Sequence, residues 1–315
     1  MRPTVLSLFL FCSIALAFGQ TDTITYYSSG NIMERVGKVN GVLHGKYTMY
    51  SEDGKTNVEG AFENGKHVGE WTQYYNDGNI GRKLTYENDQ IIYLKEYGYG
   101  KILSEGQILN NQKHGQWKKY FLNEAYLAAK DVQPKIEQIG HFKNGIPHGE
   151  TKHFNEDGTI GSIIEYNEGN IVSNKSYWAN GQLISDCTYI NGQLQGKCVS
   201  YDEDGRIWIE TNYVNNKMDG PYKSYKFGTL HVEGTYKGDL KHGYWKLYES
   251  GAGEVTSEGN YSNGVKEGLW KEDERLAAIV EEGYSHSIGE YKNGVKTGEW
   301  KYYNGTNNYV KSKFF

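Results

Sequence analysis

The chain repeats a nine-residue pattern near both of its ends. Glu63 to Trp71 reads ENGKHVGEW, and Lys292 to Trp300 reads KNGVKTGEW. Blurred copies fill the interval at a spacing of about 24 residues, and a fixed period of this size is typical of repeat architectures. The repeat restricts the fold more than any other feature, because each copy must be a small unit that packs against its neighbours.

The copies share one template. A glycine and an aromatic residue precede an Asn-Gly pair, and a second glycine and two further aromatic residues follow it. The Asn position of the template falls at Asn40, Asn64, Asn88, Asn110, Asn144, Glu168, Asn191, Asn215, Gly238, Asn263 and Asn293. The template therefore predicts eleven units.

Each unit is expected to form two strands and two turns. Asn-Gly tolerates positive φ, so Asn64-Gly65 starts a tight reversal, and Gly69 is interpreted as the flexible exit of that loop. Acidic-Gly or Asn-Gly pairs such as Asp77-Gly78 mark a second turn toward the next unit. Short turns leave no room for crossover helices, so consecutive strands must pair antiparallel. We predict an all-β fold, an elongated antiparallel meander of about eleven stacked β-hairpins in a single-layer sheet.

The aromatic residues suggest how such a sheet is covered. The glycine before the first aromatic residue, such as Gly60, leaves bare backbone that a cross-strand ring can cover, and we expect a Trp or Tyr of the neighbouring unit to lie over it. Trp71 and Tyr74 are three residues apart, so in a regular strand they point to opposite faces. Either both faces carry aromatic cover or a bulge realigns one ring, and we favour the first because both faces of a single sheet meet water.

Composition agrees with a thin sheet. The chain has 28 Tyr and 7 Trp, and rings with apolar bodies and polar tips can cover a sheet too thin for an aliphatic core. The formal net charge is −5, which leaves no excess of Lys and Arg to neutralise phosphates. Nucleic acid is therefore excluded as a predicted partner.

The first twenty residues, MRPTVLSLFLFCSIALAFGQ, differ from the rest. One basic residue, an apolar run and small residues at Ala15, Ala17 and Gly19 are typical of a secretory signal peptide. The run is shorter than the roughly 20 residues that a membrane-spanning helix needs. We predict a signal peptide over 1–20, cleaved after Ala17 or after Gly19, and a single exported repeat domain over 21–315 without a transmembrane segment.

Two insertions interrupt the period, near 122–138 and near 271–283. Both are rich in Ala, Leu, Glu and Lys, which predicts two short helical insertions, with tolerated surface insertions as the alternative. The segments Thr23–Ser29 and Asn307–Phe315 are predicted to cap the two ends of the sheet, because uncapped edges invite pairing.

The pattern YKNGVKTGEWKYY, from Tyr291 to Tyr303, resembles the MORN repeat, specifically the bacterial variant of the YwqK family of antitoxins. The resemblance covers nearly all of residues 21–315. It implies hairpins stacked into an elongated sheet, and for function it implies only an interaction surface. Lipid binding and antitoxin activity belong to the family by label, without a residue motif that this chain matches.

Catalytic and metal-binding patterns are weak in this sequence. His44, His114, His148 and His242 share one template position, but successive copies lie roughly 9 to 10 Å apart in a meander, too far to share one zinc ion. Acidic turns lack the spacing of a calcium loop, and no Gly-x-Ser-x-Gly elbow occurs. We predict no enzymatic activity, no metal and no cofactor.

Cys187 and Cys198 flank one Asn-Gly turn. If Ile190 faces Lys197, then Tyr189 faces Cys198 and Cys187 lies diagonally, about 7 Å from Cys198. That distance slightly exceeds the reach of a disulfide, and a register shift or bulge would close the gap. An exported chain meets an oxidising environment, so a disulfide and two separate thiols remain alternatives.

These observations favour an exported, non-enzymatic repeat protein that acts as a scaffold and binds an unknown partner protein through an aromatic sheet surface. A carbohydrate-binding module of the cell envelope, whose rings stack on a glycan, is one alternative. An antitoxin-like binder of a partner toxin is another. The residues predicted to form the binding surface are Trp71, Trp117, Trp245, Trp270 and Trp300.

Overall fold

The computed structural model describes residues 19–128, 132–249, 253–276 and 284–315. The predicted signal peptide lies almost wholly outside these residues. The described chain is all-β, with 25 strands in one antiparallel sheet. Its contacts cluster into two compact units, one formed by the described residues among 1–112 and 127–133 and the other by those among 113–126 and 134–315. The prediction of a single domain over 21–315 stays a prediction.

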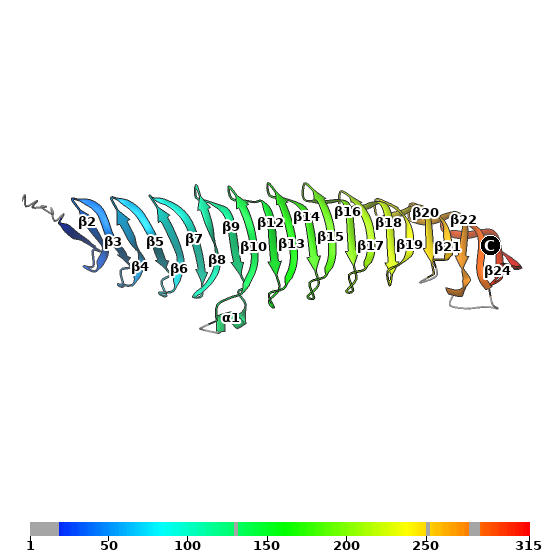
Figure 1. The fold of residues 1–315 in the computed structure, drawn as a ribbon, viewed down its shortest axis with the longest axis horizontal. Coiled ribbons are helices and arrows are strands. Elements are labelled where there is room, and N and C mark those ends of the chain that lie inside the picture. The colour runs from blue at the N-terminus through cyan, green and yellow to red at the C-terminus, as the bar shows by residue number, and fades with distance from the viewer. Residues whose placement is uncertain (1–18, 129–131, 250–252, 277–283) are drawn as a thin grey trace, which may run out of the picture. The chain divides into compact units, whose positions relative to one another are not determined.

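In the first unit each strand pairs antiparallel with the next one along the chain, as the ribbon shows (Figure 1). Its core is a cluster of Val36, Phe62, Trp71 and Leu84. The strands of this unit are β1 (Gln20–Tyr26), β2 (Ile32–Val39), β3 (Val42–Tyr50), β4 (Thr56–Glu63), β5 (Lys66–Tyr74), β6 (Ile80–Glu87), β7 (Gln90–Gly98) and β8 (Lys101–Leu109).

The second unit follows the same pattern, and its buried cluster contains Trp270, Tyr284, Trp300 and Tyr302. Its strands are β9 (Gln112–Tyr120, whose first residue belongs to the first unit), β10 (Ile136–Lys143), β11 (Ile146–Pro147), β12 (Gly149–Phe154), β13 (Ile160–Asn167), β14 (Asn170–Tyr177), β15 (Leu183–Ile190), β16 (Gln193–Tyr201), β17 (Ile207–Val214), β18 (Lys217–Lys226), β19 (Thr229–Lys237), β20 (Leu240–Tyr248), β21 (Val255–Ser262), β22 (Val265–Asp273), β23 (Tyr284–Lys292), β24 (Val295–Asn304) and β25 (Tyr309–Phe314).

The strand count exceeds the 22 strands of eleven hairpins. Each of the eleven predicted turns separates two consecutive strands, but β1 and β25 add a strand at the two ends of the series. One further strand arises because His148 interrupts a strand and divides it into β11 and β12. The terminal strands occupy the segments predicted as caps: β1 pairs with β2, and β25 pairs with β24.

The two predicted helical insertions contain less helix than expected. The first insertion has one five-residue α-helix, α1 (Glu124–Ala128), and the second has a three-residue 3-10 helix, η1 (Glu274–Leu276). Neither reaches the length at which helices are stable by themselves, so the described parts of both insertions are single turns and not regular helices. Residues 129–131 and 277–283 lie outside the described part of the chain.

The Asn-Gly turns behave as predicted. All eleven template positions, from Asn40 to Asn293, have positive φ, including Glu168 and Gly238. The turns are also linked to one another: the amide N of Gly264 donates to the carbonyl O of Lys241 at 2.9 Å, and that of Gly294 donates to Lys266 at 3.0 Å. These bonds join successive hairpins at the strand ends where the Asn-Gly turns lie. This side of the sheet is here called the first-turn edge. The opposite edge is the second-turn edge.

The prediction that the second template glycine is the exit of the loop is wrong. Gly69 lies inside β5 with φ +67°, because the turn is only Asn64-Gly65 and the strand resumes at Lys66. The pairing of β4 with β5 shifts register between Glu59 and Ala61. Gly69 therefore supplies the left-handed residue of a β-bulge, which inserts two extra residues into β5.

The expected cover of glycine by a ring from another strand is confirmed at Gly60 and Gly234, but the ring belongs to the same hairpin and not to the neighbouring unit. A Cβ atom added to Gly60 would lie 2.1 Å from the Trp71 ring, and the same close approach joins Gly234 to Trp245. Tyr74 lies on the other face of the sheet, because its hydroxyl donates to Glu59, the neighbour of Gly60 in the strand. The interpretation that both faces carry aromatic residues is therefore correct for this hairpin.

The bulge also determines how the two cysteines meet. The register pairs Ile190 with Gln193 and Tyr189 with Leu194, so the diagonal arrangement of the cysteines is wrong. A shift after Cys187 places it directly opposite Cys198, with their Cα atoms 4.1 Å apart and a disulfide between them.

We expect the protein purified without reductant to be lighter than the reduced protein by the mass of two hydrogens. Reduction should destabilise the β15–β16 hairpin by about 2 kcal/mol, because the bond restricts the unfolded chain. Intact-mass spectrometry with and without reductant, followed by urea unfolding of both forms, measures these effects. An unchanged mass contradicts the disulfide, and a Cys187→Ala/Cys198→Ala variant controls for reductant effects elsewhere.

Candidate functional site

The tryptophans predicted as the binding surface are buried. The exposed fraction is 6% for Trp71, 4% for Trp117, 1% for both Trp245 and Trp270, and 0% for Trp300. They lie on one face of the sheet, here called the aromatic face, and pack against rings of neighbouring strands. Their burial corrects the prediction that these rings form an open binding surface, and the rings of Trp71, Trp245, Trp270 and Trp300 fill the space above a glycine.

A cation closes most of these rings from outside. The ammonium of Lys296 lies 3.9 Å from the centroid of the Trp300 ring, and Lys266 lies 4.3 Å from Trp270. The indole N–H is satisfied as well, since that of Trp270 donates to a backbone carbonyl at 3.0 Å. The sequence Lys-x-Gly-x-Trp therefore encodes a closed packing motif, in which a cation–π contact covers the ring and adds about 1 kcal/mol.

The other face of the sheet, here called the charged face, carries repeated Lys–Glu–Tyr groups. Glu210 accepts from Lys197 at 2.8 Å and from the Tyr225 hydroxyl at 2.9 Å. Hydrogen bonds from Lys197 and Tyr225 hold the pKa of Glu210 below its usual range. Glu233 accepts a hydrogen bond from the Tyr248 hydroxyl at 2.6 Å, which raises the pKa of Tyr248 to about 12.

An apolar stripe crosses the charged face of the second unit. The residue before each buried aromatic ring points to this face, and it is Glu70 or Gln116 in other hairpins but Tyr244 in β20 and Leu269 in β22. Tyr244 is 49% exposed and Leu269 is 63% exposed. The apolar stripe consists of Pro221, Tyr244, Leu269 and Phe314, which occupy this face on β18, β20, β22 and β25.

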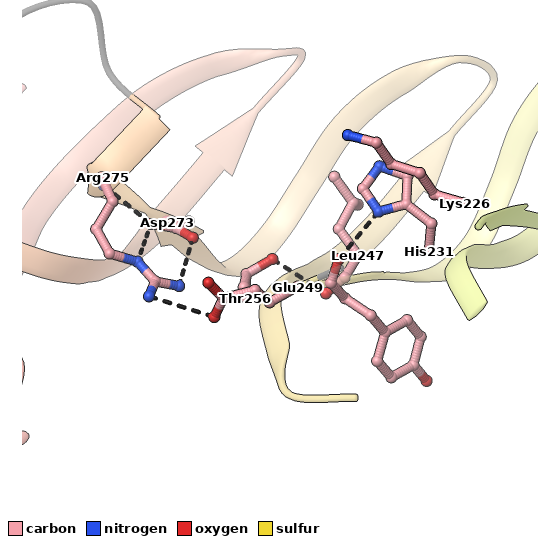
Figure 2. A pocket seen from close by; sticks show the side chains of 8 residues that line it. Lys226, His231, Leu247, Glu249, Thr256, Asp273 and Arg275 are labelled. Carbon is pink, nitrogen blue, oxygen red and sulfur yellow. Dashed lines mark hydrogen bonds and ion pairs between the residues drawn. The ribbon is translucent and has the colours of Figure 1, made fainter. Parts of the chain in front are cut away.

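A hollow of about 420 Å³ lies at the second-turn edge of the same unit. Figure 2 shows Lys226 and His231 on one side of the hollow, and Arg275 with Asp273 on the other. Its remaining lining residues are Leu247, Tyr248, Glu249 and Thr256.

The Arg275 guanidinium is held in place by two carboxylates. Its Nε and Nη2 donate to the two oxygens of Asp273 at 3.0 and 2.9 Å, and its Nη1 donates to Glu249 at 3.4 Å. Burial opposes ionisation of Asp273, whose side chain is 5% exposed, but the hydrogen bonds from Arg275 outweigh it and lower the pKa of Asp273. Asp273 is therefore a fixed acceptor that orients Arg275.

Within the described residues, no group of three or more His, Cys, Asp or Glu side chains is arranged to hold a metal ion. His114, His148 and His242 lie in strands or between them, and the Nδ1 atom of each is buried without a hydrogen-bond partner. Across that same part of the chain, no helix combines the length and the apolar character needed to cross a membrane.

Sequence reasoning missed the exposed positions because it followed the repeated residues. Leu269 and Tyr244 stand where Glu and Gln occur in other hairpins, and Phe227 stands in a tight turn where Asn or Asp is usual. In each case the signal was a departure from the template. The tryptophans agree with the template and serve packing.

Comparison with protein families matches four segments, residues 43–66, 68–97, 173–191 and 194–215, to the MORN repeat variant. These segments cover hairpins of both units and amount to less than half of the chain. No curated protein matches the chain.

Two crystal structures resemble the fold weakly. They contain TcdB2-TccC3-Cdc42 and TcdB2-TccC3, with 11% and 12% sequence identity and TM-scores of 0.21 and 0.15. The matches cover 95% and 94% of this chain but only 20% and 17% of the chains matched. At these TM-scores the likeness supports no conclusion about function.

Proposed function

We propose that the protein is an exported, non-enzymatic repeat scaffold of the YwqK type of MORN variant, and that it binds a partner protein through the apolar stripe. The four matched segments support the repeat architecture. The sequence of residues 1–20 supports export. The exposure of Leu269 and Phe314 supports the choice of surface.

This proposal rests mainly on one observation: at the template position before the buried aromatic ring, apolar residues replace the polar residues of other hairpins. Several exposed apolar residues on one face differ from a single one, because together they offer more apolar surface to a partner. Leu269 loses its exposed area only if another molecule covers it, and a partner that also reached Tyr244 would bury more apolar surface. Polar residues lie between the members of the stripe: Asn260 on β21, Glu290 on β23 and Glu299 on β24. Elsewhere on the charged face of this unit, Lys197 pairs with Glu210 and Lys223 with Glu233, so these charges partly neutralise one another.

The test uses a variant with Tyr244→Gln and Leu269→Gln. Gln116 occupies the same template position in β9, so glutamine is compatible with the fold. We expect the affinity for a partner, first captured from the native cell envelope by a photo-crosslinker at position 269, to fall about tenfold or more, as for a central interface anchor. Binding is measured with the purified partner.

Gln116→Ala is the matched control, because it changes the same template position outside the stripe and should leave binding unchanged. Equal affinity of the double variant and the original protein would exclude the stripe as the binding surface. Equal loss with Gln116→Ala would show that the effect is not specific to the stripe.

A further inference from the structure

The hollow at the second-turn edge has the size and the polar groups of a ligand site. Its volume of about 420 Å³ falls within the roughly 300 to 1,000 Å³ of small-molecule sites. The groups that line it come from strands β18 to β22 and from η1, so hydrogen-bonded strands position most of them. Figure 2 shows the two cationic side chains, Lys226 and Arg275, on opposite sides of it.

The hollow offers both donors and acceptors. A guanidinium has five N–H groups, and Arg275 commits three of them to Asp273 and Glu249, which leaves two for a ligand. The Lys226 ammonium has no acidic partner among the described residues. The Thr256 hydroxyl donates to the carbonyl O of Leu247 at 3.2 Å, so its oxygen remains free to accept.

The formal charges in the hollow cancel. Lys226 and Arg275 are cationic, whereas Glu249 and Asp273 are anionic. A strongly anionic or cationic ligand would therefore gain little net attraction. Hydroxyl groups suit the site, because each hydroxyl donates one hydrogen bond and accepts others.

The residue after Lys226 is an exposed phenylalanine in a costly conformation; it does not itself line the hollow but contacts Lys226, which does. Phe227 follows Lys226 directly in the turn between β18 and β19, and the Lys226 ammonium lies 5.9 Å from the ring centroid. Phe227 has φ +50°, a left-handed conformation that is unfavourable for a bulky residue, and it is 75% exposed. Asn would adopt this conformation at a lower cost, and the contact with Lys226 is the one local interaction of the ring recorded among the described residues.

We propose that this hollow binds a neutral saccharide, with Phe227 stacked on one face of a sugar ring and with Arg275, Glu249 and Lys226 hydrogen-bonded to its hydroxyls. Apolar C–H groups of the sugar contact the aromatic face, and the polar edge of the sugar meets the mixed donors and acceptors. This site is separate from the apolar stripe.

The experiment screens the full-length mature protein on an array of neutral and acidic oligosaccharides and then titrates the best neutral member by calorimetry. We expect binding of neutral members, and a loss of affinity of about tenfold or more with Phe227→Asn. Arg275→Lys, which retains the charge but loses the paired geometry, should weaken binding as well. Leu269→Gln should leave it unchanged.

Tyr99→Asn is the matched control, because Tyr99 has φ +52° in a turn of the same form and is 79% exposed, but no residue next to it in the chain lines this hollow, whereas Phe227 follows Lys226. Both Asn variants relieve the same backbone strain, so both should fold, as circular dichroism will check. The proposal fails if no array member binds, if only acidic members bind, or if Phe227→Asn binds as tightly as the original protein.

Discussion

Replacing Gly259 by alanine should destabilise the second unit by about 3 kcal/mol, at the upper end of the usual cost of overpacking. A Cβ atom at this position would lie 2.3 Å from the ring of Trp270, far inside van der Waals contact. The ring cannot move aside, because Trp270 is 1% exposed and packs against Tyr261 at 5.0 Å. Lys266 covers its outer side at 4.3 Å.

The backbone of Gly259 is not in the left-handed region, so the whole cost arises from the contact with Trp270. Gly305→Ala is the matched control, since a Cβ atom there would meet nothing within 4 Å. Urea unfolding measures the loss of stability. Amide hydrogen exchange should localise it to β20 through β23, because each hairpin contacts only its neighbours. Equal midpoints for the two variants would contradict the packing role of the glycine.

A second large effect is expected at alkaline pH, where the protein should unfold between about pH 10 and pH 12. Burial or hydrogen bonds to glutamate raise the pKa of several half-buried tyrosines from 10 to about 12; they are Tyr47, Tyr74, Tyr93, Tyr225 and Tyr248. A phenol that donates to a carboxylate cannot lose its proton without placing two negative charges side by side.

The direction in which the free energy of unfolding changes with pH follows from the number of protons bound by the folded and the unfolded states. Below pH 10 both states keep these phenols protonated, so the stabilising contribution is complete. Between pH 10 and 12 the unfolded chain releases protons that the folded chain still holds, and the free energy of unfolding falls as the pH rises. Tyrosinate absorbance and circular dichroism, recorded together, should therefore change in one sharp transition and not in a broad series of independent titrations.

Glu59→Gln combined with Glu233→Gln removes the carboxylates that accept from Tyr74 and Tyr248. In this variant two more tyrosines should ionise before the protein unfolds. Glu168→Gln, an exposed substitution in a turn, is the control and should leave the profile unchanged. If the tyrosines of the original protein titrate near pH 10 without loss of structure, burial and the hydrogen bonds to glutamate do not raise their pKa, and the prediction is wrong.

The local elements were predictable because their signals are local. Asn-Gly pairs specify left-handed turns, and the period of about 24 residues specifies how many turns follow one another. The cover of Gly60 by a cross-strand ring could also be predicted, because bare backbone favours a large ring opposite it, but the ring was expected from the neighbouring unit and Trp71 belongs to the same hairpin. Gly69 was misinterpreted because a loop glycine and a bulge glycine are indistinguishable in one sequence.

The sequence by itself determined an all-β meander built from eleven hairpins, because turn conformation and strand order depend on residues close together in the chain. Only the tertiary structure decided which side chains remain exposed. Burial depends on neighbours in adjacent hairpins. Trp300 is therefore buried and serves packing, whereas Leu269 is exposed, although the repeated tryptophans were the clearer signal in the sequence. The bulges that align Cys187 with Cys198 arise in the same way, from pairing between strands and not from either strand alone.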